Sequence, residues 1–482
     1  MNKVFDSKRN QILALIGIGF LLFLPLNHIL IGLRYNCFHL IDYGIYQQAI
    51  YQIADGVSWN PYVTVRDIFI FNEHFDPVIY LAAPFVRLFN YSYWSLAVFE
   101  WLWYVGFCLL ALKWAKIQSI KEWILAAGFI FFARGLLSAV LFSGHPSTWA
   151  IVPIILLVYF IYKDHTWGII LSALSLNFFK ETFPFAVFGL AIPFLLSKDF
   201  KRGLPIFIIG CFFVAFELKL RSMWLGKTFA YGNSYLGEIA ADPVGRTLKL
   251  FKEFEYDSFF KIFFPYFIPL FYLFRREKYH WDFFKTPLAK VSFFLIPMML
   301  IHFIINRYYF HHASQFSAAI IGMILFSGVL TELVKSKKIF WISLVLILVN
   351  GMSMYTRLVK SSVGNKVGRC VIYKEKIPYA EKIREIVDTI AEDKIIYTTG
   401  GIGPRIMRPR LSLYHHEMCK KMDRYDYLIL ELKQTDSIWP MHPDTVQGIY
   451  KNCREFADEI LMENDFFFFA KGKFPHKCIF GF

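Results

Sequence analysis

The sequence predicts a mainly α, polytopic helical membrane protein with a small α/β domain at its C-terminal end. Of its 482 residues, 56% are hydrophobic and 18% are charged. Soluble globular proteins are about 45–50% apolar and about 25% charged. The apolar residues form blocks of roughly 16 to 23, the length that a helix needs to cross about 30 Å of hydrocarbon. Blocks of this length between short charged segments are typical of consecutive membrane spans.

Roughly eleven spans are predicted on this basis. The first is too long for the apolar core of a signal peptide and no small-residue cleavage site follows it, so it is expected to be retained. The apolar segment at 77–89 is shorter and is expected to lie along the membrane surface or to re-enter the membrane. The predicted spans are 11–33, 94–112, 122–142, 147–162, 166–179, 182–197, 203–218, 259–274, 288–305, 313–333 and 339–356.

Lysine and arginine residues occur in alternate loops between these spans. Such residues favour the cytoplasmic side of a membrane. The pattern therefore predicts an integral protein of the cytoplasmic (inner) membrane with a cytoplasmic N-terminus and an extracytoplasmic C-terminal domain. Much of the net charge of +15 is explained by these residues facing anionic lipid. No nucleic-acid-reading motif accompanies the charge, so no nucleic-acid partner is expected.

The chain is expected to divide into a transmembrane part, 1–356, with a first external loop at 34–93, and a soluble domain at 357–482. In the second part, helical periodicity at 377–392 and 445–464 alternates with strand-like segments at 393–399, 425–432 and 465–472. This alternation predicts a small α/β layer. The segment "TTGGIGPR" follows a strand but lacks the spacing of a nucleotide-binding loop, and a turn is expected there.

Five of the seven cysteines fall on the predicted external side. They form neither a CxxC pair nor a zinc-ligand spacing. The spacing leaves open which of them pair in disulfides. These five residues are Cys37, Cys370, Cys419, Cys453 and Cys478.

Ionisable side chains near membrane depth are costly and usually functional. The predicted cytoplasmic loops carry mostly lysine and arginine, whereas the external span ends combine carboxylates, imidazoles and basic groups. This asymmetry indicates a functional site on the external face. The external group comprises Asp42, Glu73, His74, Asp76, Arg87, His145, Lys180, Glu181, Arg221, Arg307, His311 and His312.

Asp42 stands at the head of a helical segment that ends at Gly56. Helix capping alone would account for an acid at this position. The segment is also amphipathic, with Ile45, Ala49, Ile50 and Ile53 expected to face lipid and the glutamines Gln47, Gln48 and Gln52 expected to face away. A helix of this kind lies along the membrane interface. Asp42 would then lie at the level of lipid headgroups, where a lipid-linked phosphate is found.

The segment "FNEHFDP" places Glu73, His74 and Asp76 directly before the apolar segment at 77–89. Imidazole is the commonest metal ligand, and oxygen donors suit Mg²⁺ or Mn²⁺. Together with Asp42, these residues form a candidate divalent-metal or phosphate site. The spacing matches no metal motif, and a solvated turn ended by Pro77 explains the segment equally well.

Two further short segments belong to the same predicted layer. Lys180 and Glu181 lie in a very short connection, so both charges are expected at the bilayer surface. Arg307 and the pair His311 and His312 precede a late span. The planar guanidinium group of arginine suits phosphate recognition.

In their order, these motifs resemble the family of predicted membrane proteins labelled domain of unknown function 2079. The shared features are an acid soon after the first span, "HFDPVIYLAAPF", "KE" at a span boundary, "YYFHHASQFSAAIIG" and "YDYLILEL". That family is similar in turn to the GT-C class of glycosyltransferases. Here "DYGIYQQAIYQIADG" resembles the GT-C pattern of an acid, a tyrosine and a glycine at Asp42, Tyr46 and Gly56. Tyr43 stands where many members have a second acid.

The resemblance implies transfer of a sugar, with inversion, from a polyprenyl-phosphate donor to an acceptor on the extracytoplasmic face. The acceptor would be a glycan, a lipid or a protein. Asp42 is expected to act as base or metal-linked acid and Glu181 as the second carboxylate. Candidates for substrate or phosphate contacts are Tyr46, His74, Lys180, Arg307, His311 and His312.

Two other function classes remain as alternatives. A transporter or flippase of a lipid-linked or charged substrate would bind near mid-membrane, often between internal repeats. The sequence shows no repeat between its halves, and its ionisable residues cluster at one face. A non-catalytic membrane scaffold whose tail binds a partner is the second alternative, and the cluster of acids, histidines and arginines argues against it.

Overall fold

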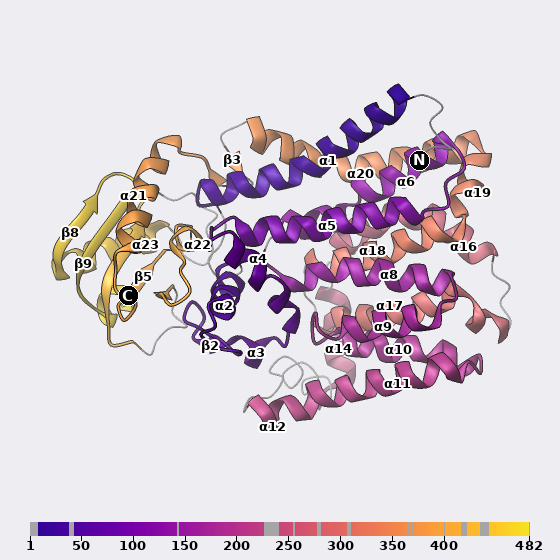
Figure 1. Ribbon diagram of the computed structural model, residues 1–482, viewed down its shortest axis with the longest axis horizontal. Helices are drawn as coiled ribbons and strands as arrows, with labels where there is room; N and C mark the ends of the chain where they lie inside the picture. Colours follow the sequence, from indigo (N-terminus) through magenta and orange to yellow (C-terminus); the bar gives the residue numbers. More distant parts are fainter. Residues whose placement is uncertain are drawn as a thin grey trace.

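The computed structural model describes residues 8–37, 43–141, 144–225, 241–253, 256–276, 281–305, 310–363, 366–367, 370–399, 401–415, 422–433 and 443–481. A bundle of apolar helices fills one side of the molecule, and a smaller domain with a sheet adjoins one end of the bundle (Figure 1). This arrangement agrees with the predicted fold class.

Each predicted span coincides with one helix or with two consecutive helices. Prolines stand in the first turn of several of them, where the missing N–H costs no hydrogen bond. The bundle consists of α1 (Lys8–Arg34), α5 (Ser95–Trp114), α6 (Ile120–Phe131), α7 (Arg134–Leu141), α8 (Ile151–Tyr162), α9 (Thr166–Leu176), α10 (Phe183–Leu196), α11 (Phe200–Ala215), α12 (Arg221–Leu225), α14 (Pro243–Glu253), α15 (Tyr256–Phe263), α16 (Phe267–Arg276), α17 (Pro287–Ile305), α18 (Phe310–Ser327), α19 (Val329–Lys335) and α20 (Lys337–Val363).

Not all of these helices have the length of a full membrane span. Within the described residues, four are long and apolar enough to cross a membrane, and the bent pair α18–α19, with an angle of 72°, makes a fifth. This number is lower than the roughly eleven spans expected from apolar length. Some predicted spans are divided by a break, as between α6 and α7, and others, such as α8 and α9, form helices of only 12 and 11 residues. The four helices are Gln11–Arg34, Ser95–Trp114, Phe200–Leu225 and Lys337–Ser361.

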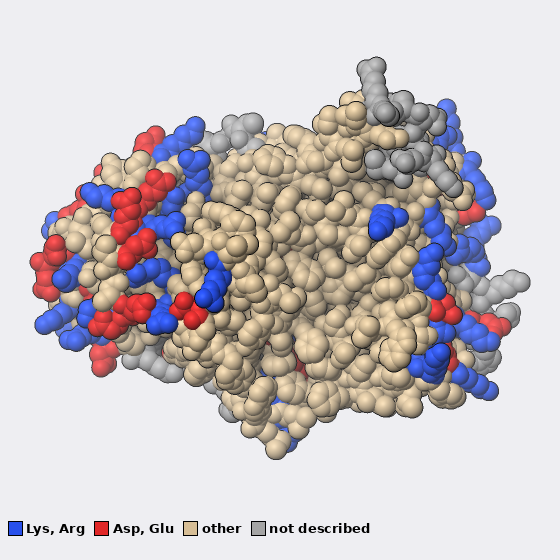
Figure 2. Space-filling view, viewed as in Figure 1, with Lys and Arg blue, Asp and Glu red and all other residues tan. Residues whose placement is uncertain are grey.

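A broad apolar surface separates two charged ends of the molecule (Figure 2). One end is the C-terminal domain, which carries both signs of charge. At the other end the backbone N–H of Lys116 donates to Leu325 O at 3.0 Å, and Arg276 donates to Ser327 O at 3.1 Å. These bonds bring several of the predicted basic loops together. An exposed apolar surface of this extent is expected where lipid surrounds a protein.

The first external loop folds into short elements against the bundle. They are α2 (Ile45–Ala54), β1 (Tyr62–Val63), β2 (Ile68–Phe69), α3 (Ile70–Glu73), η2 (Pro77–Leu81) and α4 (Ala83–Leu88). The short helices η2 and α4 replace a full span at 77–89, as predicted.

The expected lipid-facing side of α2 is a wrong prediction, because Ile45, Ala49 and Ile50 are buried. The C-terminal domain covers this helix. Gln47 Nε2 donates to Pro404 O at 2.9 Å, and Gln48 Nε2 donates to Leu411 O at 3.0 Å. The glutamines therefore fasten α2 to the domain.

The C-terminal domain is built on a five-stranded sheet in the order β6-β5-β7-β9-β8. Strand β5, between β6 and the central strand β7, is parallel to both, whereas β9 is antiparallel to β7 and β8. The strands are β5 (Ile395–Thr398), β6 (Ser412–Tyr414), β7 (Arg424–Glu431), β8 (Ala457–Glu463) and β9 (Phe467–Pro475), and the helices are α21 (Ile377–Asp388), α22 (Gly403–Ile406), α23 (Pro443–Cys453) and α24 (His476–Phe480).

Three strands of this sheet were expected and two were not. The edge strand β8 lies within 445–464, where a helix was predicted throughout. Its residues are mostly exposed, so its sequence lacks the apolar alternation that marks a half-buried strand. After β5, the expected turn is followed by the single-turn helix α22. Pro404 lies in the first turn of α22 and therefore does not prevent it.

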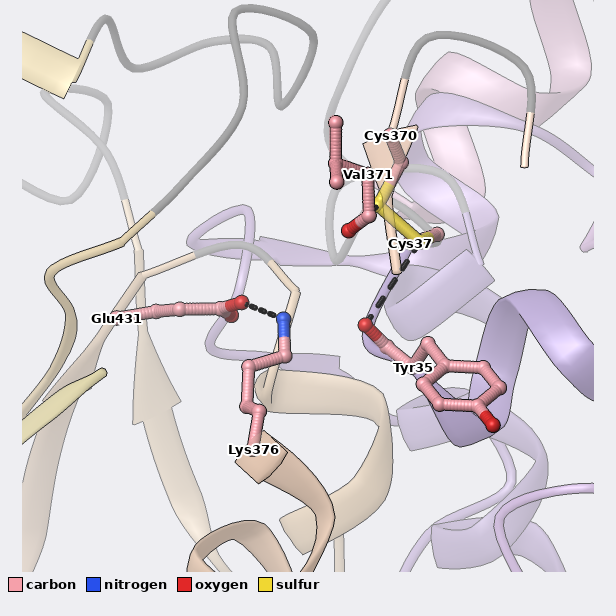
Figure 3. The surroundings of a disulfide bond; sticks show 6 residues. All are labelled: Tyr35, Cys37, Cys370, Val371, Lys376 and Glu431. Carbon is pink, nitrogen blue, oxygen red and sulfur yellow. Dashed lines mark hydrogen bonds and ion pairs between the residues drawn. A yellow bond between two sulfur atoms is a disulfide. The ribbon is translucent and has the colours of Figure 1, made fainter. Parts of the chain in front are cut away.

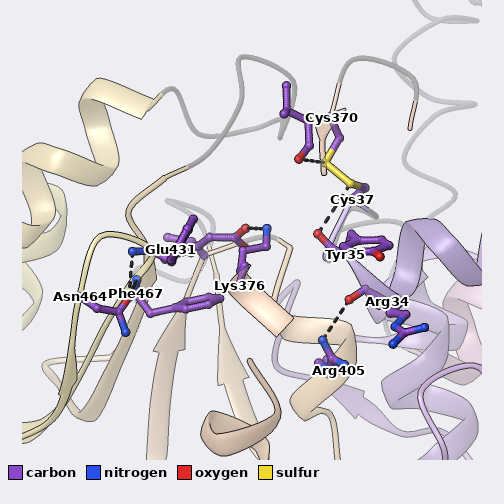
Figure 4. Close-up of polar contacts among 12 residues, drawn as sticks. Arg34, Tyr35, Cys37, Cys370, Lys376, Arg405, Glu431, Asn464 and Phe467 are labelled. Atoms are coloured by element: carbon purple, nitrogen blue, oxygen red, sulfur yellow. Dashed lines mark hydrogen bonds and ion pairs between the residues drawn. A yellow bond between two sulfur atoms is a disulfide. The ribbon is translucent and has the colours of Figure 1, made fainter. Parts of the chain in front are cut away.

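The C-terminal domain is joined covalently to the end of α1. A disulfide links Cys37, just after α1, to Cys370 (Figure 3). Nearby, Arg405 Nη1 donates to Arg34 O at 3.0 Å, and Lys376 forms a buried ion pair with Glu431 (Figure 4). A second disulfide, Cys453–Cys478, lies within the domain. The domain is thus fixed beside the first external loop.

Candidate functional site

A buried polar cluster lies where the first external loop meets the turn between α9 and α10. The backbone N–H of Val78 in η2 donates to Phe178 O at 3.1 Å. This bond brings the segment with His74 and Asp76 against the turn that carries Lys180 and Glu181. Four separately predicted site residues thereby come together.

Two hydrogen bonds define the centre of the cluster. His74 Nδ1 and Glu181 Oε1 lie 3.2 Å apart, and Tyr46 OH donates to Asp76 Oδ2 at 2.8 Å. Glu181 and Asp76 are both buried, with 4% and 1% of their surface exposed. Tyr46, on α2, had been predicted to contact substrate from the resemblance alone.

Each of the two carboxylates has one buried oxygen that is not satisfied by the described part of the chain. Asp76 Oδ1 and Glu181 Oε2 have no hydrogen-bond partner there. Buried polar atoms are nearly always hydrogen-bonded, because desolvation without a partner costs about 1–3 kcal/mol or more. Two such oxygens in one cluster are acceptors that the described part of the chain does not use.

The cluster separates the titration of its two acids. Burial raises the pKa of Asp76 to about 6, with the Glu181 carboxylate adding to the effect and His74 and Lys180 opposing it. Burial also acts to raise the pKa of Glu181, but His74 and Lys180 outweigh it and lower that pKa below its usual value. Glu181 is therefore held as a carboxylate, while Asp76 exchanges its proton closer to neutral pH. Neighbouring acids that titrate apart are typical of acid–base sites.

A buried carboxylate in α5 positions the turn that faces α2. Glu100 Oε2 accepts the Gly144 N–H at 2.8 Å, and Glu100 Oε1 accepts the Trp149 indole N–H at 3.1 Å. Gly144 has a φ of +103°, and a Cβ there would lie 2.6 Å from Tyr43 Cα. Only glycine allows this approach, so the turn packs directly against the backbone of Tyr43, just before α2.

The next residue of that turn, His145, reaches the cluster. Its ring meets the ring of Tyr46 edge-on, with centroids 5.8 Å apart. Burial lowers the pKa of His145 to about 3, with Lys180 and His74 adding to the effect. The ring is therefore neutral at physiological pH and packs against Tyr46 as an uncharged group.

The cluster has a further acid that the sequence analysis missed. Glu217 lies in the π-helical segment η4 (Phe216–Leu220), and its Oε2 accepts Arg221 Nη1–H at 2.8 Å. Both side chains are buried, and Glu217 interacts electrostatically with Glu181 and Asp76. Arg221 had been placed in the external layer without a role. The sequence did contain a signal for this pair, because an acid and an arginine stand four residues apart at the end of an apolar span. The π-helical turn is a second, structural signal, since such turns are frequent at functional sites.

Several predicted site residues fall outside this description. Asp42 and Arg307 are not among the described residues, and the side chains of Glu73, His311 and His312 are not described either. Their roles stay predictions. Among the described residues, no group of three His, Cys, Asp or Glu is placed to hold a metal ion. The predicted Mg²⁺ or Mn²⁺ site depends on Asp42 and Glu73 and likewise stays a prediction.

Comparison with known proteins identifies the family. Residues 38–452 match the family model described as "Predicted membrane protein (DUF2079)". The chain belongs to this family, which confirms the resemblance drawn from its motifs. No curated protein sequence matches the chain significantly.

The fold is similar to that of a protein solved in two states. The crystal structure of ArnT from Cupriavidus metallidurans bound to undecaprenyl phosphate has a TM-score of 0.57 and 10% sequence identity. The alignment covers 96% of this chain and 98% of ArnT. The same protein in the apo state gives a TM-score of 0.52 and 11% identity over the same shares. The GT-C-like architecture expected from the motifs is therefore confirmed at the level of the fold.

Proposed function

We propose that this chain is an integral membrane glycosyltransferase that transfers a sugar from a polyprenyl-phosphate donor to an acceptor on the extracytoplasmic face. The proposal rests mainly on the buried cluster of His74, Asp76 and Glu181, in which two carboxylate oxygens have no hydrogen-bond partner among the described residues. The cluster lies beneath the first-loop helix of a fold that resembles ArnT, and that protein was solved with undecaprenyl phosphate.

The side of the membrane is part of this proposal. Disulfides form and persist in oxidising compartments outside the cytoplasm. The disulfide Cys37–Cys370 lies at the same end of the bundle as the cluster, and the basic loops gather at the opposite end. Both observations support an extracytoplasmic site and a cytoplasmic N-terminus.

The proposed reaction is a single displacement at the anomeric carbon. The acceptor hydroxyl oxygen attacks that carbon, and the bond to the phosphate oxygen breaks with its electron pair remaining on the lipid phosphate. The hydroxyl proton passes to a carboxylate that acts as general base. Attack from the face opposite the leaving phosphate inverts the anomeric configuration.

The residues divide between the two ends of this displacement. Asp42, from the resemblance, and Asp76, from its pKa of about 6, are the candidate bases, because a base works best when its pKa lies near the operating pH. Glu181 keeps His74 in place and maintains a negative charge beside it. Lys180 and Arg221 would neutralise the charge that develops on the leaving phosphate. Arg307, His311 and His312 would add contacts to the same phosphate or sugar, and Tyr46 fixes the Asp76 carboxylate.

The proposal is tested by comparing cell-envelope glycans and lipid-linked sugars in a deletion strain and its parent. We expect one polyprenyl-phosphate sugar to accumulate in the deletion strain and one glycan modification to be lost. The intact gene should restore both, and a Glu181→Gln variant expressed at the same level should restore neither. Unchanged glycans together with altered uptake of a solute would contradict the proposal and favour a transporter.

A further inference from the structure

A cavity separate from the candidate site opens at the surface of the helical bundle, where most of its lining residues, including Lys261 and Ser353, are exposed. Its volume is about 390 Å³. It lies between α7, α20 and the segment formed by α15 and the following helical turn. Its lining residues are Arg134, Phe260, Lys261, Phe264, Val349, Asn350 and Ser353.

The cavity lies deep in the membrane part. Asn350 is near the middle of the candidate span Lys337–Ser361. At 1.5 Å per residue, it is roughly 16 Å from the outer end of that span. Arg134 begins α7, and the turn with Gly144 and His145 follows the other end of this helix. The cavity is therefore separated from the candidate site by about the 10 Å length of α7.

The polar lining of the cavity suits an anion. Arg134 and Lys261 provide two positive charges, and Asn350 and Ser353 lie one turn apart on α20. Asn350 Nδ2 is a buried donor without a hydrogen-bond partner in the described part of the chain. None of the lining residues of this cavity is an acid. Cationic side chains at this depth are costly and usually mark a functional site.

The mouth of the cavity has the opposite character. Val349, Phe260 and Phe264 are 67%, 51% and 47% exposed, and they face the apolar surroundings of the bundle. A ligand that fits both parts has an anionic, hydrogen-bond-accepting head and an apolar remainder that extends into the bilayer. A phosphate group on a lipid combines these properties, and the guanidinium fork of arginine matches phosphate oxygens.

We propose that this cavity binds the phosphate group of a membrane lipid at a site distinct from the cluster of His74, Asp76 and Glu181. The inference is independent of the proposed sugar transfer, because it depends on the lining of the cavity alone. Arg134 and Lys261 contact the phosphate, Asn350 donates to one of its oxygens, and the acyl chains leave between Phe260 and Phe264.

The test is native mass spectrometry of the purified full-length chain titrated with phosphatidylglycerol. The dissociation constant of the double variant Arg134→Gln/Lys261→Gln for this lipid is expected to be roughly tenfold higher than that of the unmodified chain. Lys113→Gln is the matched control, because it removes an exposed cation at the end of α5, away from the cavity. Its affinity for phosphatidylglycerol should equal that of the unmodified chain.

Two further measurements keep the outcomes distinct. Asn350→Leu retains both cations, removes the buried donor and narrows the cavity, so it should also weaken lipid binding. It replaces the double variant as the test if the double variant does not fold. Millimolar inorganic phosphate should not displace the lipid; displacement would show that the site takes free phosphate and would overturn the membrane-lipid assignment. Equal lipid retention by all variants would overturn the site itself. Glu181→Gln should bind phosphatidylglycerol as the unmodified chain does, whether or not it transfers sugar. Lipid binding in the cavity is therefore tested separately from sugar transfer.

Discussion

At the end of the bundle away from the C-terminal domain, Lys335 forms an ion pair with Glu332, and the two side chains are 65% and 42% exposed. At the opposite end, His74 pairs with Glu181, and these side chains are 22% and 5% exposed. The first pair spans three residues of sequence, whereas the second joins residues 107 apart. The two ends therefore carry charge in different physical settings.

The two settings indicate different roles for the charges at the two ends. Exposed pairs are screened by water and salt and contribute little to stability, so the basic end is explained by membrane orientation. Buried charges cost desolvation free energy that their mutual attraction often fails to recover. We therefore propose that the buried cluster, which leaves two carboxylate oxygens unsatisfied in the described chain, binds a polar ligand.

The largest effect is expected for Glu181→Gln at the buried end. The change removes the negative charge beside His74 while preserving side-chain size, and we expect sugar transfer to fall at least about 100-fold. The measurement is the initial rate of transfer from a labelled polyprenyl-phosphate sugar in membranes. Glu332→Gln is the matched control at the basic end and should retain the full rate. Equal rates in both variants would remove the distinction between the ends.

A smaller effect is expected for Gly144→Ala, which tests the packing of the turn against α2. Both Gly144 and Gly328 have positive φ values, +103° and +85°, so alanine costs about 1–2 kcal/mol at either position. At Gly144 the new Cβ also meets the Tyr43 backbone, whereas at Gly328 nothing lies within 4 Å. We expect roughly a tenfold loss of transfer for Gly144→Ala, since small misplacements of catalytic groups are costly.

Gly328→Ala is the control for the free-energy cost of placing alanine at a positive φ. It should lower the midpoint of thermal unfolding without lowering the transfer rate of the folded protein. Similar transfer rates in the two alanine variants would show that the contact between Gly144 and Tyr43 does not position the site.

The pH dependence sharpens the comparison further. Because burial raises the folded-state pKa of Asp76 from 3.8 to about 6, the folded chain holds a proton that the unfolded chain has released between these values. The contribution of this group to stability is therefore fully present below about pH 4 and is lost as the pH rises to about 6. If Asp76 is the base, transfer should rise over the upper part of this range, with its midpoint near pH 6.

Asp76→Asn should abolish this inflection in the pH profile of kcat/KM. Asp164→Asn, which removes an exposed carboxylate at the basic end, should leave it in place. An inflection that persists in Asp76→Asn would assign the titration to another group.

The smallest effect is expected for Lys335→Gln. The variant breaks an exposed pair three residues apart, so the free energy of unfolding should change by less than about 0.5 kcal/mol. Thermal unfolding in detergent provides the measurement. If Lys335→Gln lowered the free energy of unfolding as much as Glu181→Gln does, the ion pairs at both ends would be needed for the stability of the fold.

Much of the bundle could be predicted from the sequence, because apolar length and charged loops are local properties of the chain. The helices α1, α5 and α20 follow directly from such blocks. The burial of α2 could not be predicted, because it depends on the docking of residues more than 350 positions away. The edge strand β8 was read as a helix, because an exposed strand has no apolar alternation to reveal it.

The site was predictable in its composition and not in its geometry. Acids and a histidine on the external face identified Glu181, His74 and Asp76, and the resemblance added Tyr46. The sequence could not show that Tyr46 bonds Asp76, or that His74 bonds Glu181, because both contacts depend on tertiary packing. The pairing of Cys37 with Cys370, 333 residues apart, was open for the same reason.

The most direct test of the account is photo-crosslinking with a polyprenyl phosphate that carries a photoreactive group beside its phosphate. We expect labelled peptides from residues 43–93 and from the turn between α9 and α10. We also expect that Lys180→Gln reduces this label while Lys335→Gln does not. Label confined to the basic loops at 163–165 and 198–202, unaffected by Lys180→Gln, would contradict the assignment of the lipid-phosphate site to the buried end.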